Sequence, residues 1–288
     1  MFVKTFSRLV RAASALFLAA GALPALAAIP AAERDVLTAL YTSTNGAGWT
    51  NHTNWNGAAG TECTWYGVTC DAGQTHVIAI SLYNNNLAGA LPATLNDLTQ
   101  LQFFQAISNH LTGAIPSLAG LTALVNFAAA DNQLTGPIPS LSGLTALGEF
   151  QVSENQLSGP IPSLAGLSLG VFNASNNQLT GSIPSLAGLA LTQFYVDGNQ
   201  LTGPLPAAPA SLQFARVCPN TSLSANPNAA MNTIWRDAVT NNGYDFSCVG
   251  PAITATAAAA AVPTLETAGL ALLALLLAGG AAARMRRS

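Results

Sequence analysis

The sequence of 288 residues is poor in charge, because only 7% of its residues are charged, against about 25% in an average protein. Lys4 is the one lysine, and neither Lys nor Arg occurs from Asp35 to Ala215. The chain therefore lacks the cationic surface that neutralises nucleic-acid phosphates, and we expect no nucleic-acid partner. Half of the residues are hydrophobic, which argues against disorder.

The N-terminal segment has the pattern of a secretory signal. Basic residues within 4–11 precede a short apolar run at 12–23, and the small residues of Ala25–Ala27 follow. This order predicts a signal peptide at 1–27 that is cleaved after Ala27. An uncleaved N-terminal anchor is the alternative, although the apolar run is short for a bilayer.

The C-terminal segment ends in sixteen uncharged residues, 268–283, with three arginines directly behind them. This pattern predicts a short membrane helix at about 267–283, with its arginines on the cytoplasmic side. A five-residue string stands just before it: Val262, Pro263, Thr264, Leu265 and Glu266.

Residues 262–288 resemble the IPTL-CTERM sorting tail of Gram-negative bacteria, a relative of PEP-CTERM. The family begins with Ile where Val262 stands here. The resemblance implies export across the inner membrane, transient anchoring by the helix, processing by an exosortase-like protease, and delivery to the cell surface or extracellular matrix. A permanent single-span anchor is the alternative. Between the two tails, three basic residues stand against eleven acidic ones, a net charge of −8.

Six segments in the middle of the chain share the pattern N-x-L-x-G-x-x-P at intervals of 22 to 24 residues. A fixed period in the twenties with regular leucines is typical of stacked leucine-rich repeats. One turn cannot bury its own apolar face, so neighbouring turns must stack into a solenoid. We expect the repeat asparagines to point inward and to bond the backbone of adjacent turns: Asn85, Asn109, Asn132, Asn155, Asn177 and Asn199.

The repeat resembles the plant-specific subclass of leucine-rich repeats, whose signature is L-x-G-x-I-P after the asparagine. The resemblance implies an α/β-type, right-handed horseshoe or arc. Short parallel strands would line its concave face, and 3-10, polyproline and turn segments its convex side. We place six repeats in 77–211 and caps in 28–76 and 212–250, the latter with a degenerate repeat, and a linker in 251–261.

The caps contain the four cysteines. The string from Cys63 to Cys70, C-x-W-x-G-V-x-C, resembles the N-terminal cap of plant-type repeat proteins, and Cys218 and Cys248 bracket the C-terminal cap. Four cysteines allow three pairings, and an exported chain favours disulfides. We predict Cys63–Cys70 and Cys218–Cys248, one in each cap.

Patterns for catalysis or metal binding are scarce. The sequence has no C-x-x-C and no histidine at ligand spacing, so we expect no metal, no cofactor and no enzyme. The G-x-S-x-G match at 166–170 falls at a join between repeats and lacks the strand–turn–helix context it needs. Asp131 and Glu154 occupy equivalent positions in adjacent repeats. Three interpretations of that pair stay open: ordinary polar surface residues, a glycosidase pair or a weak calcium site.

The concave face is the candidate binding surface, because strand alternation turns every second residue outward there while the framework residues repeat. We therefore predict a non-enzymatic recognition protein that binds an unknown protein or glycan. A structural component of the polysaccharide matrix is the alternative. The candidate binding residues are Tyr83, Phe103, Gln105, Ile107, Glu149, Gln151, Asn173, Tyr195 and Asp197.

Overall fold

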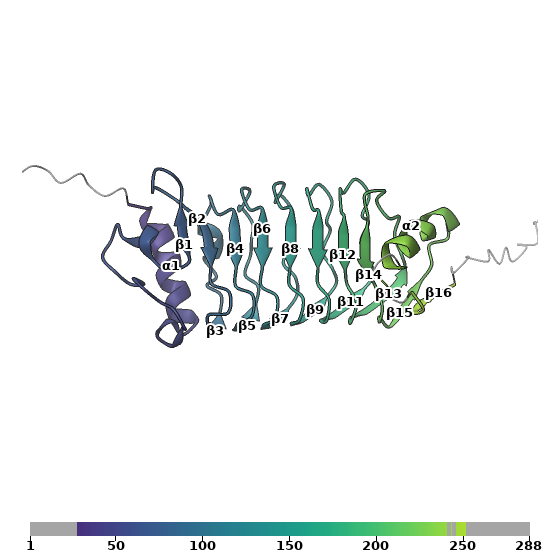
Figure 1. Cartoon of the computed structure of the whole chain (residues 1–288), viewed down its shortest axis with the longest axis horizontal. Coiled ribbons are helices and arrows are strands. Elements are labelled where there is room, and N and C mark those ends of the chain that lie inside the picture. Colours follow the sequence, from purple (N-terminus) through teal and green to yellow (C-terminus); the bar gives the residue numbers. More distant parts are fainter. Residues whose placement is uncertain (1–27, 241–242, 244–245, 252–288) are drawn as a thin grey trace, which may run out of the picture.

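The computed structural model describes residues 28–240, 243 and 246–251. In this part the chain winds into an elongated solenoid with one helix at each end (Figure 1). Within the described residues, no helix is both long and apolar enough to span a membrane. The signal peptide of 1–27, the sorting tail with its membrane helix, and all of the linker except Pro251 lie outside the described residues.

The first sheet has eight strands in the order β1-β2-β4-β6-β8-β10-β12-β14. All its neighbours pair in parallel except β1 and β2, which are antiparallel. Its bounds are β1 (Val68–Cys70), β2 (Val77–Ser81), β4 (Phe103–Gln105), β6 (Asn126–Ala128), β8 (Glu149–Gln151), β10 (Val171–Asn173), β12 (Gln193–Tyr195) and β14 (Phe214–Arg216). The predicted solenoid with short parallel strands is confirmed.

A second parallel sheet runs along the other side of the coil, where we expected turns and polyproline segments. It forms because the N-Q-L-T-G segments of successive turns stack in register and pair their backbone groups. Its bounds are β3 (Ala88–Ala90), β5 (His110–Ala114), β7 (Gln133–Gly136), β9 (Gln156–Gly159), β11 (Gln178–Gly181), β13 (Gln200–Pro204), β15 (Ser222–Ser224) and β16 (Val249–Gly250). The 3-10 helix η3 (Leu95–Asp97) joins β3 to β4.

The core between the two sheets is a single continuous column of apolar side chains. One phenylalanine from each of five turns stacks on the next, with ring centroids 5.2 to 5.8 Å apart and interplanar angles of 15° to 18°. Leucines fill the rest of each turn. The stacked rings are Phe104, Phe127, Phe150, Phe172 and Phe194.

The repeat asparagines are buried and bond the backbone of neighbouring turns. Asn132 is representative: its Oδ1 accepts the Leu111 N–H at 2.9 Å, and its Nδ2 donates to the carbonyl oxygens of Ala106 at 2.9 Å and Ala130 at 3.1 Å. The six asparagines are 2% to 9% exposed. Asn220 extends the series by one turn, since its Oδ1 accepts the Leu201 N–H at 2.8 Å.

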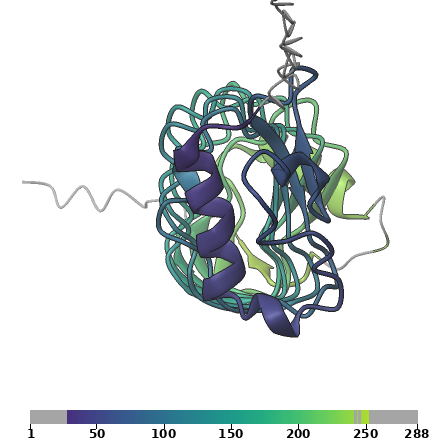
Figure 2. The same ribbon diagram turned by 90° about the vertical axis from the view of Figure 1, so that its left-hand side faces the viewer.

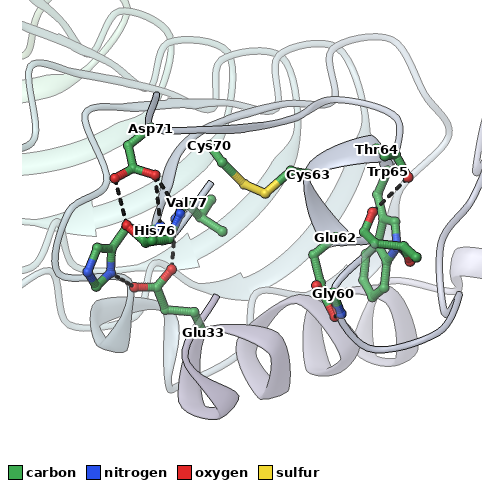
Figure 3. The surroundings of a disulfide bond; sticks show 12 residues. Glu33, Gly60, Glu62, Cys63, Thr64, Trp65, Cys70, Asp71, His76 and Val77 are labelled. Atoms are coloured by element: carbon green, nitrogen blue, oxygen red, sulfur yellow. Dashed lines mark hydrogen bonds and ion pairs between the residues drawn. A yellow bond between two sulfur atoms is a disulfide. The ribbon is translucent and has the colours of Figure 1, made fainter. Parts of the chain in front are cut away.

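The N-terminal cap covers one open end of the coil with the helix α1 (Ala31–Ser43), which Figure 2 shows lying across that end. Two short 3-10 helices follow, η1 (Gly46–Gly48) and η2 (Glu62–Thr64). The predicted disulfide Cys63–Cys70 is present. Figure 3 shows it beside two buried glutamates, Glu33 and Glu62.

Both buried glutamate carboxylates have hydrogen-bond or ion-pair partners. Glu33 contacts His76 Nδ1 at 2.6 Å and accepts the Val77 N–H at 2.7 Å, and Glu62 pairs with Arg34. Nearby, the half-buried Asp71 accepts hydrogen bonds from the backbone and hydroxyl of Thr75, which lower the pKa of Asp71 below its usual value. These contacts tie α1 to the first hairpin of the sheet.

The C-terminal cap closes the other end with the helix α2 (Ala229–Thr240). Trp235 of this helix is 0% exposed and meets the last ring of the stack, Phe194, edge-on with centroids 5.8 Å apart. The predicted disulfide Cys218–Cys248 is present, and the caps at both ends are therefore disulfide-bonded.

Candidate recognition surface

The outward-pointing side chains of the first sheet form the concave face, and strand register arranges them in columns. One column joins the first residues of the paired triplets: Ala79, Phe103, Asn126, Glu149, Val171, Gln193 and Phe214. A second joins the last residues: Ser81, Gln105, Ala128, Gln151, Asn173, Tyr195 and Arg216. The candidate residues that lie within strands therefore share one face.

Large apolar side chains that are exposed occur, in the described part of the chain, at three places on neighbouring turns: Tyr83 at 62%, Phe103 at 38% and Val125 at 37%. Two of these are candidates from the sequence. Val125 was missed, because the residue before a strand is not part of the outward alternation. Ile107 is half-buried.

The middle of the face is a network of amides around one carboxylate. Glu149 Oε2 accepts the side-chain N–H groups of Asn126 at 2.7 Å and Gln151 at 3.2 Å. On the preceding turns, the Ser81 hydroxyl donates to Gln105 Oε1 at 2.9 Å. These side chains are held in place before any ligand arrives.

The C-terminal part of the face carries its one cation. The Arg216 guanidinium lies over the Tyr195 ring, 4.9 Å from its centroid, and its Nε is 3.5 Å from Asp197 Oδ1. The same Asp197 oxygen accepts the Ser175 hydroxyl, and Asn173 Oδ1 accepts the Ser175 N–H at 3.2 Å. Tyr195 and Asp197 are thus brought together by Arg216, which our candidate set omitted.

A hollow of about 560 Å³ opens where strands β4 to β12 begin. Sequence reasoning did not find it, because two of its residues are glycines and carry no chemical signal. Its lining consists of Phe103, Gln105, Val125, Asn126, Gly148, Glu149, Ser168, Gly170, Val171 and Thr192.

Asp131 and Glu154 lie at the edge of the solenoid, both in the left-handed backbone region. Glu154 Oε1 accepts the Asn176 side-chain N–H, and Asp131 lines a separate polar hollow of about 400 Å³. In the region that the structure describes, no group of three or more His, Cys, Asp or Glu residues could hold a metal ion. The Ser168 hydroxyl of the G-x-S-x-G match donates to the Thr145 carbonyl at 2.8 Å, within a turn between repeats.

Comparisons with known proteins indicate which class of protein this chain resembles. A leucine rich repeat N-terminal domain model matches residues 30–71, and an IPTL-CTERM motif model matches 260–287. The receptor-like kinase TMK2 of Arabidopsis thaliana is 44% identical over 69 residues, which are 24% of this chain and 7% of the kinase. The receptor protein kinase WSS1 of Oryza sativa is 45% identical over 58 residues, 20% of this chain and 6% of the kinase.

Solved structures agree on the fold. The ectodomain of GASSHO1/SCHENGEN3 from Arabidopsis thaliana, in complex with CASPARIAN STRIP INTEGRITY FACTOR 2, has a TM-score of 0.50 and 27% identity over 70% of this chain and 28% of the ectodomain. The PEPR1–AtPEP1 complex has a TM-score of 0.53 at 24% identity over 67% of this chain and 32% of that one, a likeness of fold alone. The protein is a leucine-rich-repeat solenoid of the kind found in receptor ectodomains. The aligned segments span under a tenth of the two kinases.

Proposed function

We propose that this chain is a non-enzymatic recognition protein, exported and held at the cell surface, that binds a protein or glycan on its concave face. The observation that carries this proposal is the exposure of two apolar side chains, Phe103 and Val125, that line one hollow at the first sheet, with Tyr83 exposed on the turn before them. Aromatic side chains dominate the energy of binding interfaces, and an exposed apolar cluster on a stable scaffold favours an interaction site.

Two further findings support the proposal. The solved ectodomain that is 27% identical to this chain is described as a complex with CASPARIAN STRIP INTEGRITY FACTOR 2. The IPTL-CTERM match at 260–287 favours export followed by sorting, for which an exosortase-like protease is the expected processing partner and the inner membrane the transient anchor.

The test is a triple variant of the concave face, Tyr83→Ala, Phe103→Ala and Gln105→Ala, in the full chain. Saturable binding to the surface of the producing cells should weaken at least about tenfold, since removing two anchors typically costs more than 1.4 kcal/mol. The matched control is Thr135→Ala, Gln156→Ala and Thr180→Ala on the second sheet, where all three residues are exposed. That control should bind as the unaltered chain does.

Equal binding by the concave variant, with an unchanged circular dichroism spectrum, would move the recognition site elsewhere. Uptake into polysaccharide that never saturates would instead favour the structural matrix component.

A further inference from the structure

The row of residues that immediately precedes the strands of the first sheet has a gap in its middle. Gln102, Val125 and Thr192 stand at this position in their turns, whereas Gly148 and Gly170 stand there in the two turns between them. The hollow described above lies at this gap and is lined by both glycines. Two consecutive turns without a side chain leave a notch in the concave face.

Folding does not require glycine at either position. A Cβ added at Gly148 would lie 3.6 Å from the Val125 carbonyl oxygen, and one at Gly170 would lie 3.8 Å from the Gly148 carbonyl oxygen. Both are ordinary van der Waals contacts. Neither residue has the positive φ that makes Gly136, at +75°, conformationally necessary. The open notch is therefore a feature of the surface, separate from the needs of the backbone.

One wall of the notch is apolar and exposed. Phe103 is 38% exposed and Val125 37%, and both line the hollow. An aromatic ring that is open to solvent offers a flat apolar surface to a ligand.

The floor of the notch is polar and already ordered. Glu149 Oε2 accepts two amide N–H groups, and within the described chain its Oε1 has no hydrogen-bond partner. Asn126 is 7% exposed, and its Oδ1 is buried and has no hydrogen-bond partner among the described residues. Buried carbonyl oxygens without a donor are rare and call for an explanation. The Glu149 Oε1 acceptor would be satisfied by a hydroxyl donor from a ligand, whereas Asn126 Oδ1 lies beneath the surface and serves the site only by holding Glu149 through its N–H.

The charge of the residues around the hollow limits which class of ligand can bind there. No Lys or Arg occurs from Asp35 to Ala215, so an anionic ligand would find only the Glu149 carboxylate in the hollow. That carboxylate already accepts two neutral amide donors at Oε2, which suits further neutral hydrogen bonds. A neutral sugar ring matches the site, because it presents an apolar face of C–H groups to an aromatic wall and hydroxyls to amides and carboxylates.

We infer that this notch is a subsite for one or two units of a neutral saccharide, held with one ring against Phe103 and a hydroxyl on Glu149. The inference rests on the proposed function and narrows its ligand. A basic peptide is the competing occupant, since a cation could pair with Glu149, and the experiment separates the two.

The experiment measures binding of the full chain, by titration calorimetry, to neutral oligosaccharides of glucose, galactose, mannose and N-acetylglucosamine. Oligogalacturonate and trilysine serve as the anionic and cationic probes. The test variant is Gly148→Val with Gly170→Thr, which restores the side chains that Val125 and Thr192 carry in the adjacent turns. The control is Thr180→Val on the second sheet. Circular dichroism and the urea midpoint establish that both variants fold.

At least one neutral oligosaccharide should bind with the same affinity at about 0.05 M and 0.5 M salt, because no ion pair is formed. Filling the notch should weaken that binding at least tenfold, while the control retains it. Two results would overturn the inference: no neutral oligosaccharide binds, or the filled notch binds equally well.

Binding of trilysine alone, weakened by salt and abolished by Glu149→Gln, would assign the notch to a basic peptide and leave the proposed function standing. The proposed function itself is judged by the triple variant described above, whose cell-surface binding does not depend on which probe enters the notch.

Discussion

At the scale of single residues, the buried asparagines hold each turn to the next. Asn155 shows how: its Oδ1 accepts the Leu134 N–H from the preceding turn at 2.9 Å, while its Nδ2 donates to the carbonyls of Ala129 and Ser153, each at 3.0 Å. The amide carries its acceptor oxygen and its two N–H donors on separate atoms, so one side chain serves the backbone N–H and the carbonyl oxygens at the same time. Aspartate would have no donor for these carbonyl oxygens and would add a charge.

Replacing Asn155 with alanine should lower the free energy of unfolding by about 3 kcal/mol, because a buried backbone N–H and buried carbonyl oxygens lose their partner. Asn155→Asp should destabilise at least as much at neutral pH. Urea unfolding followed by circular dichroism measures both. The neighbouring exposed Gln156→Ala is the control and should stay within about 0.5 kcal/mol. An Asn155→Ala variant as stable as this control would contradict the structural role of the series.

Residues differ in how far sequence reveals them. The asparagines were foreseen because they repeat, and repetition at a fixed period marks a framework position. Gly148, Gly170 and the unpartnered Oδ1 of Asn126 were not foreseen, because a missing side chain or a missing partner becomes visible only against neighbouring turns. Arg216 was not among the candidates, because its contact with Tyr195 depends on side-chain direction, which strand alternation does not give.

At the scale of elements, the caps complete a core that the repeats leave open. The five stacked phenylalanines would end at Phe194 with an uncovered ring, and α2 places Trp235 over it. The Trp235 indole N–H donates to the Pro206 carbonyl at 2.8 Å, which fixes the orientation of the ring. The C-terminal cap therefore stabilises the solenoid by burying the end of the aromatic column as well as by its disulfide.

Trp235→Ala should destabilise the protein by about 3–5 kcal/mol, the range for removing a large buried aromatic side chain. The Cys218–Cys248 disulfide stays in place in this variant, so the loss reports on packing alone. Arg236→Ala, one position along the same helix and exposed, is the control. The measurement is the urea midpoint with the disulfides intact. A loss below about 1 kcal/mol would mean that the cap contributes little to the core.

The second sheet marks the limit of sequence reasoning about elements. The N-Q-L-T-G segment is short, polar at alternate positions and followed by proline, which is also typical of a turn. Its backbone becomes a strand only because the turns on either side present an equivalent segment beside it. Gly136, with φ of +75°, lies at the end of β7. Pairing between turns is a tertiary interaction, so the sequence of a single segment does not predict it.

At the scale of the whole molecule, the folded core and the two proposed processing signals occupy separate parts of the chain. Ile29, 7% exposed and part of the core cluster, is the second residue after the predicted cut at Ala27. At the other end, Cys248 and β16 complete the C-terminal cap by Gly250, upstream of Val262. Removing both tails would thus leave every core contact in place.

The mature chain recovered from the cell surface should therefore have an intact mass that corresponds to a start at Ala28 and an end near Val262. Mass spectrometry of the purified protein with its disulfides intact measures this directly. Replacing Val262–Glu266 with alanines should block the C-terminal cut and leave the protein in the membrane fraction, with its urea midpoint unchanged because the core is untouched. A surface-exposed mature chain that still ends beyond Arg287 would contradict sorting cleavage and identify the tail as a permanent anchor.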